Sequence, residues 1–123
     1  MIRFLENYSL KAHNTFGVDV NAKYFFEFTE LADLDTFLHS NDIWGIERKI
    51  VLGEGSNILF LNDYQGLVIH PKIPGIEMVK ETREHVWIEV GAGENWDEFV
   101  RYCVDSHFGG VENLAFISGD LGA

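Results

Sequence analysis

The chain has 123 residues, of which 46% are hydrophobic and 24% charged, as in an ordinary globular domain with one core. Its formal net charge of −11 argues against nucleic acid as the main partner and against docking on an anionic membrane, since both attract basic surfaces. The single cysteine, Cys103, excludes an intrachain disulfide, and no apolar run reaches the length of a membrane span.

The first half of the chain is predicted to form a strand, a helix and a second strand after about twenty residues without a clear period. Tyr24–Phe28 is short and aromatic, which is typical of a strand. Thr29 is a candidate N-cap for a helix that ends near Ser40 and Asn41. Its apolar face would consist of Leu31, Leu34, Phe37 and Leu38. The apolar segment Lys49–Leu52 is predicted to be the next strand.

The second half of the chain is predicted to contain three strands and a helix. The strands are expected at Leu67–Ile69, Ile76–Lys80 and Val86–Val90, with turns at 62–66 and 81–84. Asn95 can cap the following helix, with Glu98 at the capping-box position. One face of that helix would carry Trp96, Phe99, Val100, Cys103 and Val104. The element order predicts a mixed α/β (α+β) domain with one small sheet and two helices.

One loop stands out, Gly53-Glu54-Gly55-Ser56-Asn57, directly after the strand that ends at Leu52. Glycines tolerate positive φ and allow a ligand to approach the backbone, and successive N–H groups in such a turn form an anion-binding nest. The same residues also make a plain turn, so the loop alone leaves both interpretations open. Ile58 replaces the third glycine of a dinucleotide-binding fingerprint, and the loop lacks the lysine of a P-loop.

Other chemistry-bearing residues favour structural interpretations. The histidines at 13, 39, 70, 85 and 107 have no metal-ligand spacing, so we expect them on the surface or in loops. Cys103 and Trp96 lie on an apolar helical stripe, which predicts core packing. Ser56 lacks the Gly-x-Ser-x-Gly context of a hydrolase nucleophile, so a hydroxyl that contacts phosphate is the better interpretation.

Several motifs, taken in order, resemble the N-terminal part of the UDP-N-acetylenolpyruvoylglucosamine reductase family. The resemblance extends from about residue 8 to residue 122. Its motifs are Asn14–Gly17, Leu52–Phe60, Asp63–Gly66, Gly91–Trp96 and Gly110–Ala115. The family usually has Ile-Pro-Gly where this chain has Ile117-Ser118-Gly119, so we expect a looser loop there. The sequence ends within this second glycine-rich loop, and we therefore expect the chain to be a piece of a longer protein.

The resemblance implies the first subdomain of an FAD-binding domain of the vanillyl-alcohol-oxidase (PCMH) type. Residues 1–123 would be its N-terminal part, with the second FAD subdomain and the substrate domain absent. The loop at 53–57 would cradle the FAD diphosphate and the loop at 117–122 would supply the opposite wall. The implied cofactor-binding residues are Leu52, Gly53, Glu54, Gly55, Ser56, Asn57, Asn113, Ile117, Ser118, Gly119 and Gly122.

The family's activity is the reduction of an enolpyruvyl UDP-sugar to UDP-N-acetylmuramate with NADPH and FAD, for peptidoglycan synthesis in the bacterial cytoplasm. The family's catalytic residues fall in later regions, so none is assigned in this chain, and no metal site is expected. We expect the chain alone to be inactive. An alternative is a stand-alone module that binds a nucleotide or self-associates through the surface meant for the missing half.

Overall fold

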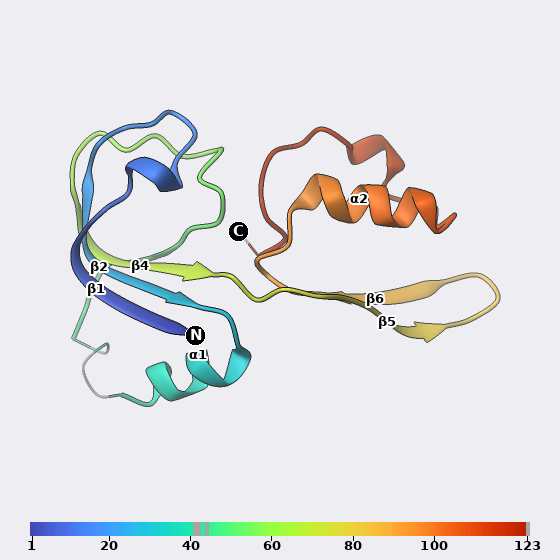
Figure 1. Ribbon diagram of the computed structural model, residues 1–123, viewed down its shortest axis with the longest axis horizontal. Coiled ribbons are helices and arrows are strands. Elements are labelled where there is room, and N and C mark those ends of the chain that lie inside the picture. The colour runs from blue at the N-terminus through green and yellow to red at the C-terminus, as the bar shows by residue number, and fades with distance from the viewer. Residues whose placement is uncertain (41–42, 44, 123) are drawn as a thin grey trace.

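The computed structural model describes residues 1–40, 43 and 45–122, and its elements form two lobes (Figure 1). The first lobe contains a four-stranded sheet with the order β1-β2-β4-β3. The second contains the β5-β6 hairpin and helix α2. After α2 the chain turns back toward the first lobe (Figure 1).

The four-stranded sheet combines one antiparallel pair with two parallel pairs. Its strands are β1 (Ile2–Ser9), β2 (Asn21–Phe28), β3 (Lys49–Val51) and β4 (Tyr64–Pro71). β1 pairs antiparallel with β2, whereas β2 and β3 both pair parallel with β4. Parallel neighbours need a crossover of about a dozen residues or more. The crossover from β3 to β4 is residues 52–63, so the glycine loop lies at the carboxyl end of β3.

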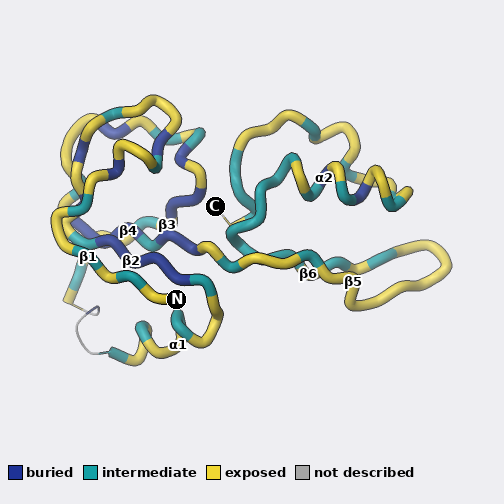
Figure 2. Tube along the Cα trace, viewed as in Figure 1, coloured by how far each residue is buried: buried dark blue, intermediate teal, exposed yellow. Residues whose placement is uncertain are grey.

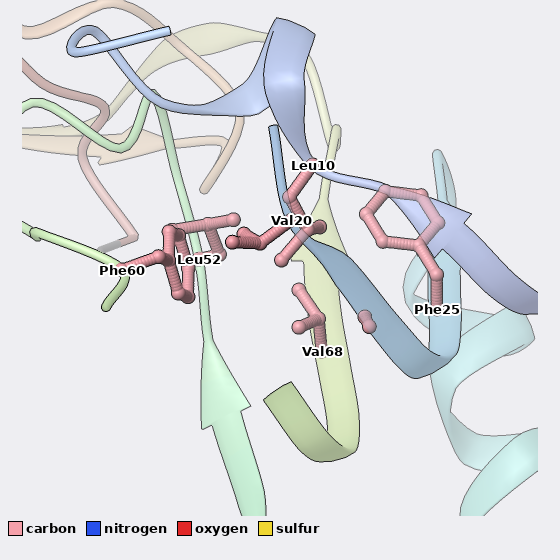
Figure 3. Close-up of a cluster of buried hydrophobic side chains, with 7 residues drawn as sticks. Leu10, Val20, Phe25, Leu52, Phe60 and Val68 are labelled. Atoms are coloured by element: carbon pink, nitrogen blue, oxygen red, sulfur yellow. The ribbon is translucent and has the colours of Figure 1, made fainter. Parts of the chain in front are cut away.

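Strand alternation gives this sheet two buried faces. One face forms the core cluster shown in Figure 3, in which residues of β2 and β4 pack beneath the loops at 10–20 and 52–60. Its members are Leu10, Val20, Ala22, Phe25, Leu52, Phe60 and Val68. The other face packs Phe26, Phe28 and Leu67 against helix α1 (Leu31–Leu38), where the rings of Phe26 and Phe37 stack 3.7 Å apart. Burial of this kind, at roughly 25 cal/mol per Å² of apolar surface, holds the glycine loop on a rigid base.

The second lobe is less buried than the first (Figure 2). Strands β5 (Ile76–Glu81) and β6 (Val86–Val90) form a two-stranded antiparallel hairpin. Helix α2 (Trp96–Asp105) begins as predicted, because Asn95 Oδ1 accepts a hydrogen bond of 3.1 Å from the Glu98 N–H. Val100 and Cys103 are its buried residues, which confirms the prediction of a core cysteine. No helix among the described residues is both long and apolar enough to span a bilayer.

The mixed α/β class with two helices is confirmed, but the expectation of one small sheet is wrong. The sheets are separate because the chain leaves β4 through Pro71 and Pro74 before it forms the hairpin. The first twenty residues are not irregular either, since they contain β1. β1 is an edge strand that pairs only with β2. Its side chains are exposed or half-buried, so its sequence shows no clear apolar pattern.

Three expected boundaries also differ. Thr29 does not cap α1, because its hydroxyl accepts a 2.7 Å hydrogen bond from the Met1 ammonium group, and Glu30 occupies the cap position. Helix α1 ends at Leu38, and Asn41 lies outside the described residues. Strand β4 is longer than Leu67–Ile69, because its pairing with β2 starts at Tyr64, inside the expected turn, and continues to Pro71.

Candidate functional site

A cavity of about 680 Å³ lies between the glycine loop and the C-terminal segment. One wall is the continuous stretch from Ile50 to Ile58, and the opposite wall is Ile117–Leu121, with Trp96 beside it. The two walls are joined by a hydrogen bond of 3.1 Å from Ser56 Oγ to the carbonyl oxygen of Ser118. Segments sixty residues apart in sequence thus form one site.

The residues of the glycine loop line this cavity, and their N–H groups have no acceptor among the described residues. Within the described part of the chain, no N–H group from Gly53 to Asn57 donates a hydrogen bond to a protein acceptor. Gly55 has a φ of +71°, a conformation that favours glycine. Free N–H groups in such a turn suit an anion, because their dipoles provide local positive potential without a cationic side chain.

The loop is held in place from behind by the Asn14–Gly17 motif. The Thr15 N–H donates a hydrogen bond of 3.1 Å to the Gly55 carbonyl oxygen. A Cβ at Gly55 would lie 2.1 Å from the His13 carbonyl oxygen and 2.8 Å from Asn14 Cα. The backbone contact therefore leaves space for glycine alone, which gives this motif a physical role that its sequence did not reveal.

Asn14 fixes the shape of that brace. Its side chain is buried and donates hydrogen bonds of 2.7 Å to Leu10 O and 3.1 Å to Val18 O. It also accepts one of 2.9 Å from the Val18 N–H. These bonds close the connection between β1 and β2 into a compact turn, which packs against the glycine loop.

The opposite wall is held by backbone pairing to the segment that precedes α2. The Trp96 N–H donates to Gly119 O at 2.9 Å, and the Leu121 N–H donates to Glu94 O at 2.9 Å. Asp120 lies between these two bonds, in an isolated bridge with Asn95. Its position in the cavity is therefore set by the backbone on both sides.

The charge of the cavity is negative. Of the described residues in its lining, only Glu54 and Asp120 carry charged side chains. Burial raises the pKa of Asp120; the charge of Lys72 opposes the rise and that of Glu54 adds to it. One carboxylate oxygen of Asp120 is buried without a hydrogen-bond partner among the described residues.

A buried polar cluster lies on the same face of the sheet as the core in Figure 3, at the end of β2 and β4. Glu27 accepts hydrogen bonds of 2.7 Å from His70 Nδ1 and 3.0 Å from Arg3 Nη1. Burial raises the pKa of Glu27, but the bonds and charges of His70 and Arg3 outweigh it and lower the pKa. Burial and the neighbouring His70 lower the pKa of His13, whose ring lies 4.8 Å from that of His70.

The expectation of surface histidines is therefore wrong for His70, which is 2% exposed. His70 lies two residues after the buried Val68 on β4, and alternate residues of a strand face the same side of the sheet. Its side chain therefore lies on the buried face. The glutamate that stabilises it, Glu27 on β2, is 43 residues away in sequence, so sequence spacing gave no sign of the pair.

The structure brings most of the predicted site residues together. Nine of them line the one cavity: Leu52, Gly53, Glu54, Gly55, Ser56, Asn57, Ile117, Ser118 and Gly119. Asn113 lies in a 3-10 turn (Glu112–Leu114) outside the lining, and Gly122 packs on Ala92, where its N–H donates at 3.0 Å to the Ala92 carbonyl oxygen. Cofactor binding by these residues stays a prediction.

The predicted cofactor-binding residues did not include Trp96, or Asp120 within the predicted wall at 117–122. Trp96 was expected in the core, but its half-buried ring borders the cavity while Nε1 donates at 2.9 Å to Leu114 O. Its place at the start of α2, next to a glycine-rich turn, was the available signal. Asp120 had a signal as well, as an acidic residue inside a glycine-rich loop.

Comparisons with known proteins agree with the resemblance. A UDP-N-acetylenolpyruvoylglucosamine reductase from Bacteroides fragilis is 44% identical over 118 residues, which are 96% of this chain and 35% of that protein. The protein of the same name from Flavobacterium johnsoniae is 43% identical over 116 residues, covering 94% of this chain and 34% of that protein. No protein-family model matches the chain.

A crystal structure supports the fold. The chain resembles the UDP-N-acetylenolpyruvylglucosamine reductase of Thermus caldophilus with a TM-score of 0.65 and 23% sequence identity. The match covers 99% of this chain and 40% of that one. The chain thus spans about a third of the length of the curated relatives it matches. Over that third, its sequence is similar to those of the UDP-N-acetylenolpyruvoylglucosamine reductases.

Proposed function

We propose that this chain is the part of a UDP-N-acetylenolpyruvoylglucosamine reductase that holds the diphosphate of FAD. The observation that carries the proposal is the row of free N–H groups from Gly53 to Asn57, which lines a cavity closed by Ser118. Anions bind at such nests through fixed backbone dipoles. The similarity to reductases of that name supports the proposal, and FAD as the ligand is what the family resemblance implies.

The residues of the cavity have separate tasks in this proposal. The N–H groups of the glycine loop would donate to the diphosphate oxygens, and Ser56 would place its hydroxyl between the two walls. Trp96 and Ile117 would cover apolar parts of the cofactor and exclude water. Bound FAD would supply hydride transfer, which no side chain of this chain can perform.

The parent reaction is then the NADPH-dependent reduction of the enolpyruvyl UDP-sugar to UDP-N-acetylmuramate, in peptidoglycan synthesis in the bacterial cytoplasm. Because this chain spans about 35% of its relatives, we propose that it has no reductase activity alone. Oxidation of NADPH, followed at 340 nm with the enolpyruvyl substrate and FAD present, would contradict that statement if the substrate stimulated it.

Titration with FAD tests the proposed site. At pH 6, FAD is expected to bind saturably with a change in flavin fluorescence, whereas riboflavin, which has no diphosphate, binds much more weakly. ADP should compete with FAD because it carries the diphosphate without the flavin. Equal affinity for FAD and riboflavin, or no binding of FAD at millimolar concentration, would refute the diphosphate site.

One observation favours a second property, self-association. In the second lobe, the hairpin side chains of Met78, Val79 and Trp87 are 42%, 54% and 43% exposed, and the Lys80 ammonium lies 4.7 Å from the centre of the Trp87 ring. Apolar surface of this kind drives association. Sedimentation should show a concentration-dependent dimer that Trp87→Ser weakens, whereas a monomer at every concentration would refute it.

A further inference from the structure

Two acidic side chains line the cavity, and Asp120 is the half-buried one, whose negative charge would repel an anionic ligand. It faces the glycine loop from the opposite wall, and hydrogen bonds on both sides pin its backbone. The wall therefore cannot swing away to remove the carboxylate. One oxygen of that carboxylate is buried and unpartnered among the described residues, a state that is costly for an ionised group.

The surrounding charges do not neutralise this carboxylate completely. Lys72 and His70 lower the pKa of Asp120, but burial and the charge of Glu54 raise it, and the net direction is upward. On the paired segment, Glu94 and Asp97 already accept hydrogen bonds from the N–H groups of residues 75 and 116. As carboxylates, they offer no hydrogen-bond donor to Asp120.

A diphosphate in this cavity would add two negative charges to a lining that already holds Glu54 on one wall and Asp120 on the other. Like charges that approach in a partly buried site strongly disfavour joint ionisation. Glu54 is exposed and can remain solvated, whereas one carboxylate oxygen of the half-buried Asp120 has neither exposure to water nor a protein partner among the described residues. Asp120 is therefore the carboxylate at which a bound proton relieves the larger cost.

We propose that Asp120 binds a proton from solvent when a diphosphate ligand enters the cavity, so that this residue sets the pH range in which the site accepts its ligand. The carboxylate oxygen gains the proton, no covalent bond to the ligand forms, and the neutral acid can donate a hydrogen bond to a phosphate oxygen. This inference rests on the proposed diphosphate site.

The experiment is an FAD titration of the chain between pH 5.5 and 8.5, with Asp120→Asn and Glu54→Gln measured beside the wild type. Linkage to one proton predicts that the wild-type Kd rises about tenfold per pH unit above the pKa of free Asp120. Asp120→Asn keeps the shape of the side chain but cannot ionise, so its Kd should be nearly constant over the range. Glu54→Gln should keep the wild-type slope.

Proton uptake can be measured directly by calorimetry in two buffers of different ionisation enthalpy. Near neutral pH, the wild type should take up close to one proton per FAD bound, and Asp120→Asn close to none. Binding by the variant alone at high pH would also support the inference. Equal Kd values and equal pH slopes for wild type and Asp120→Asn would overturn it while leaving the diphosphate site intact. Absence of binding in all three proteins would overturn both.

Discussion

Replacement of Gly55 by alanine is the sharpest perturbation of the glycine loop. The new Cβ would lie 2.1 Å from the His13 carbonyl oxygen and 2.8 Å from Asn14 Cα, below the 3.0 Å that real Cβ contacts respect. Both neighbours are backbone atoms, so neither can rotate away. The loop or its brace must shift.

Gly17 provides the matched control. It also has a positive φ, +65° against +71° for Gly55, but a Cβ there would meet no atom within 4 Å. Gly17→Ala should therefore lower the free energy of unfolding only by the cost of a side chain at positive φ, about 1–2 kcal/mol. Gly55→Ala should lower it by that amount and by roughly a further 1–3 kcal/mol, because the backbone must be displaced.

Urea unfolding followed by tryptophan fluorescence measures both free energies of unfolding, and an FAD titration measures the site. Gly55→Ala should weaken FAD binding at least tenfold, whereas Gly17→Ala should leave it within twofold of wild type. Equal stability losses in the two variants, or wild-type affinity in Gly55→Ala, would refute the claim that the brace shapes the loop.

Three further predictions concern stability. Asn14→Ala should lower the free energy of unfolding by about 3 kcal/mol, at about 1 kcal/mol for each of its three hydrogen bonds, as urea unfolding would show. Asn95→Ala should lower it by about 1 kcal/mol, because the Glu98 N–H loses its cap; an unchanged midpoint would contradict this. The lowered pKa values of His13 and Glu27 predict that stability falls with acidification. The loss should begin below the ordinary histidine pKa of about 6.5 and deepen below about 4.5, and maximal stability at pH 5 would argue against it.

The sequence predicted those helices and strands whose signals lie within a few neighbouring residues. The period of α2 and its cap at Asn95 were visible because helix spacing and capping are short-range. The β5-β6 hairpin followed from alternation around a polar turn. Strand β1 and the separation of the hairpin from the four-stranded sheet were missed, because pairing between distant strands is set by tertiary contacts.

The candidate site was predictable in its walls and less so in its chemistry. The loop at 53–57 and the segment at 117–119 were named from motifs, and the structure places both on one cavity. The brace at Gly55, the burial of His70 against Glu27 and the unpaired oxygen of Asp120 were not predictable. Each depends on contacts between residues distant in sequence, which spacing alone does not encode.

The central claim is that diphosphate binds between the glycine loop and the C-terminal segment. Amide chemical shifts of the ¹⁵N-labelled chain, recorded at pH 6 during titration with ADP, test it most directly. The account predicts that the largest shifts occur at residues 53–57 and 117–120, with little change at the polar hollow around Lys23 and Arg48. Saturable shifts at that hollow, with the glycine loop unchanged, would contradict the claim.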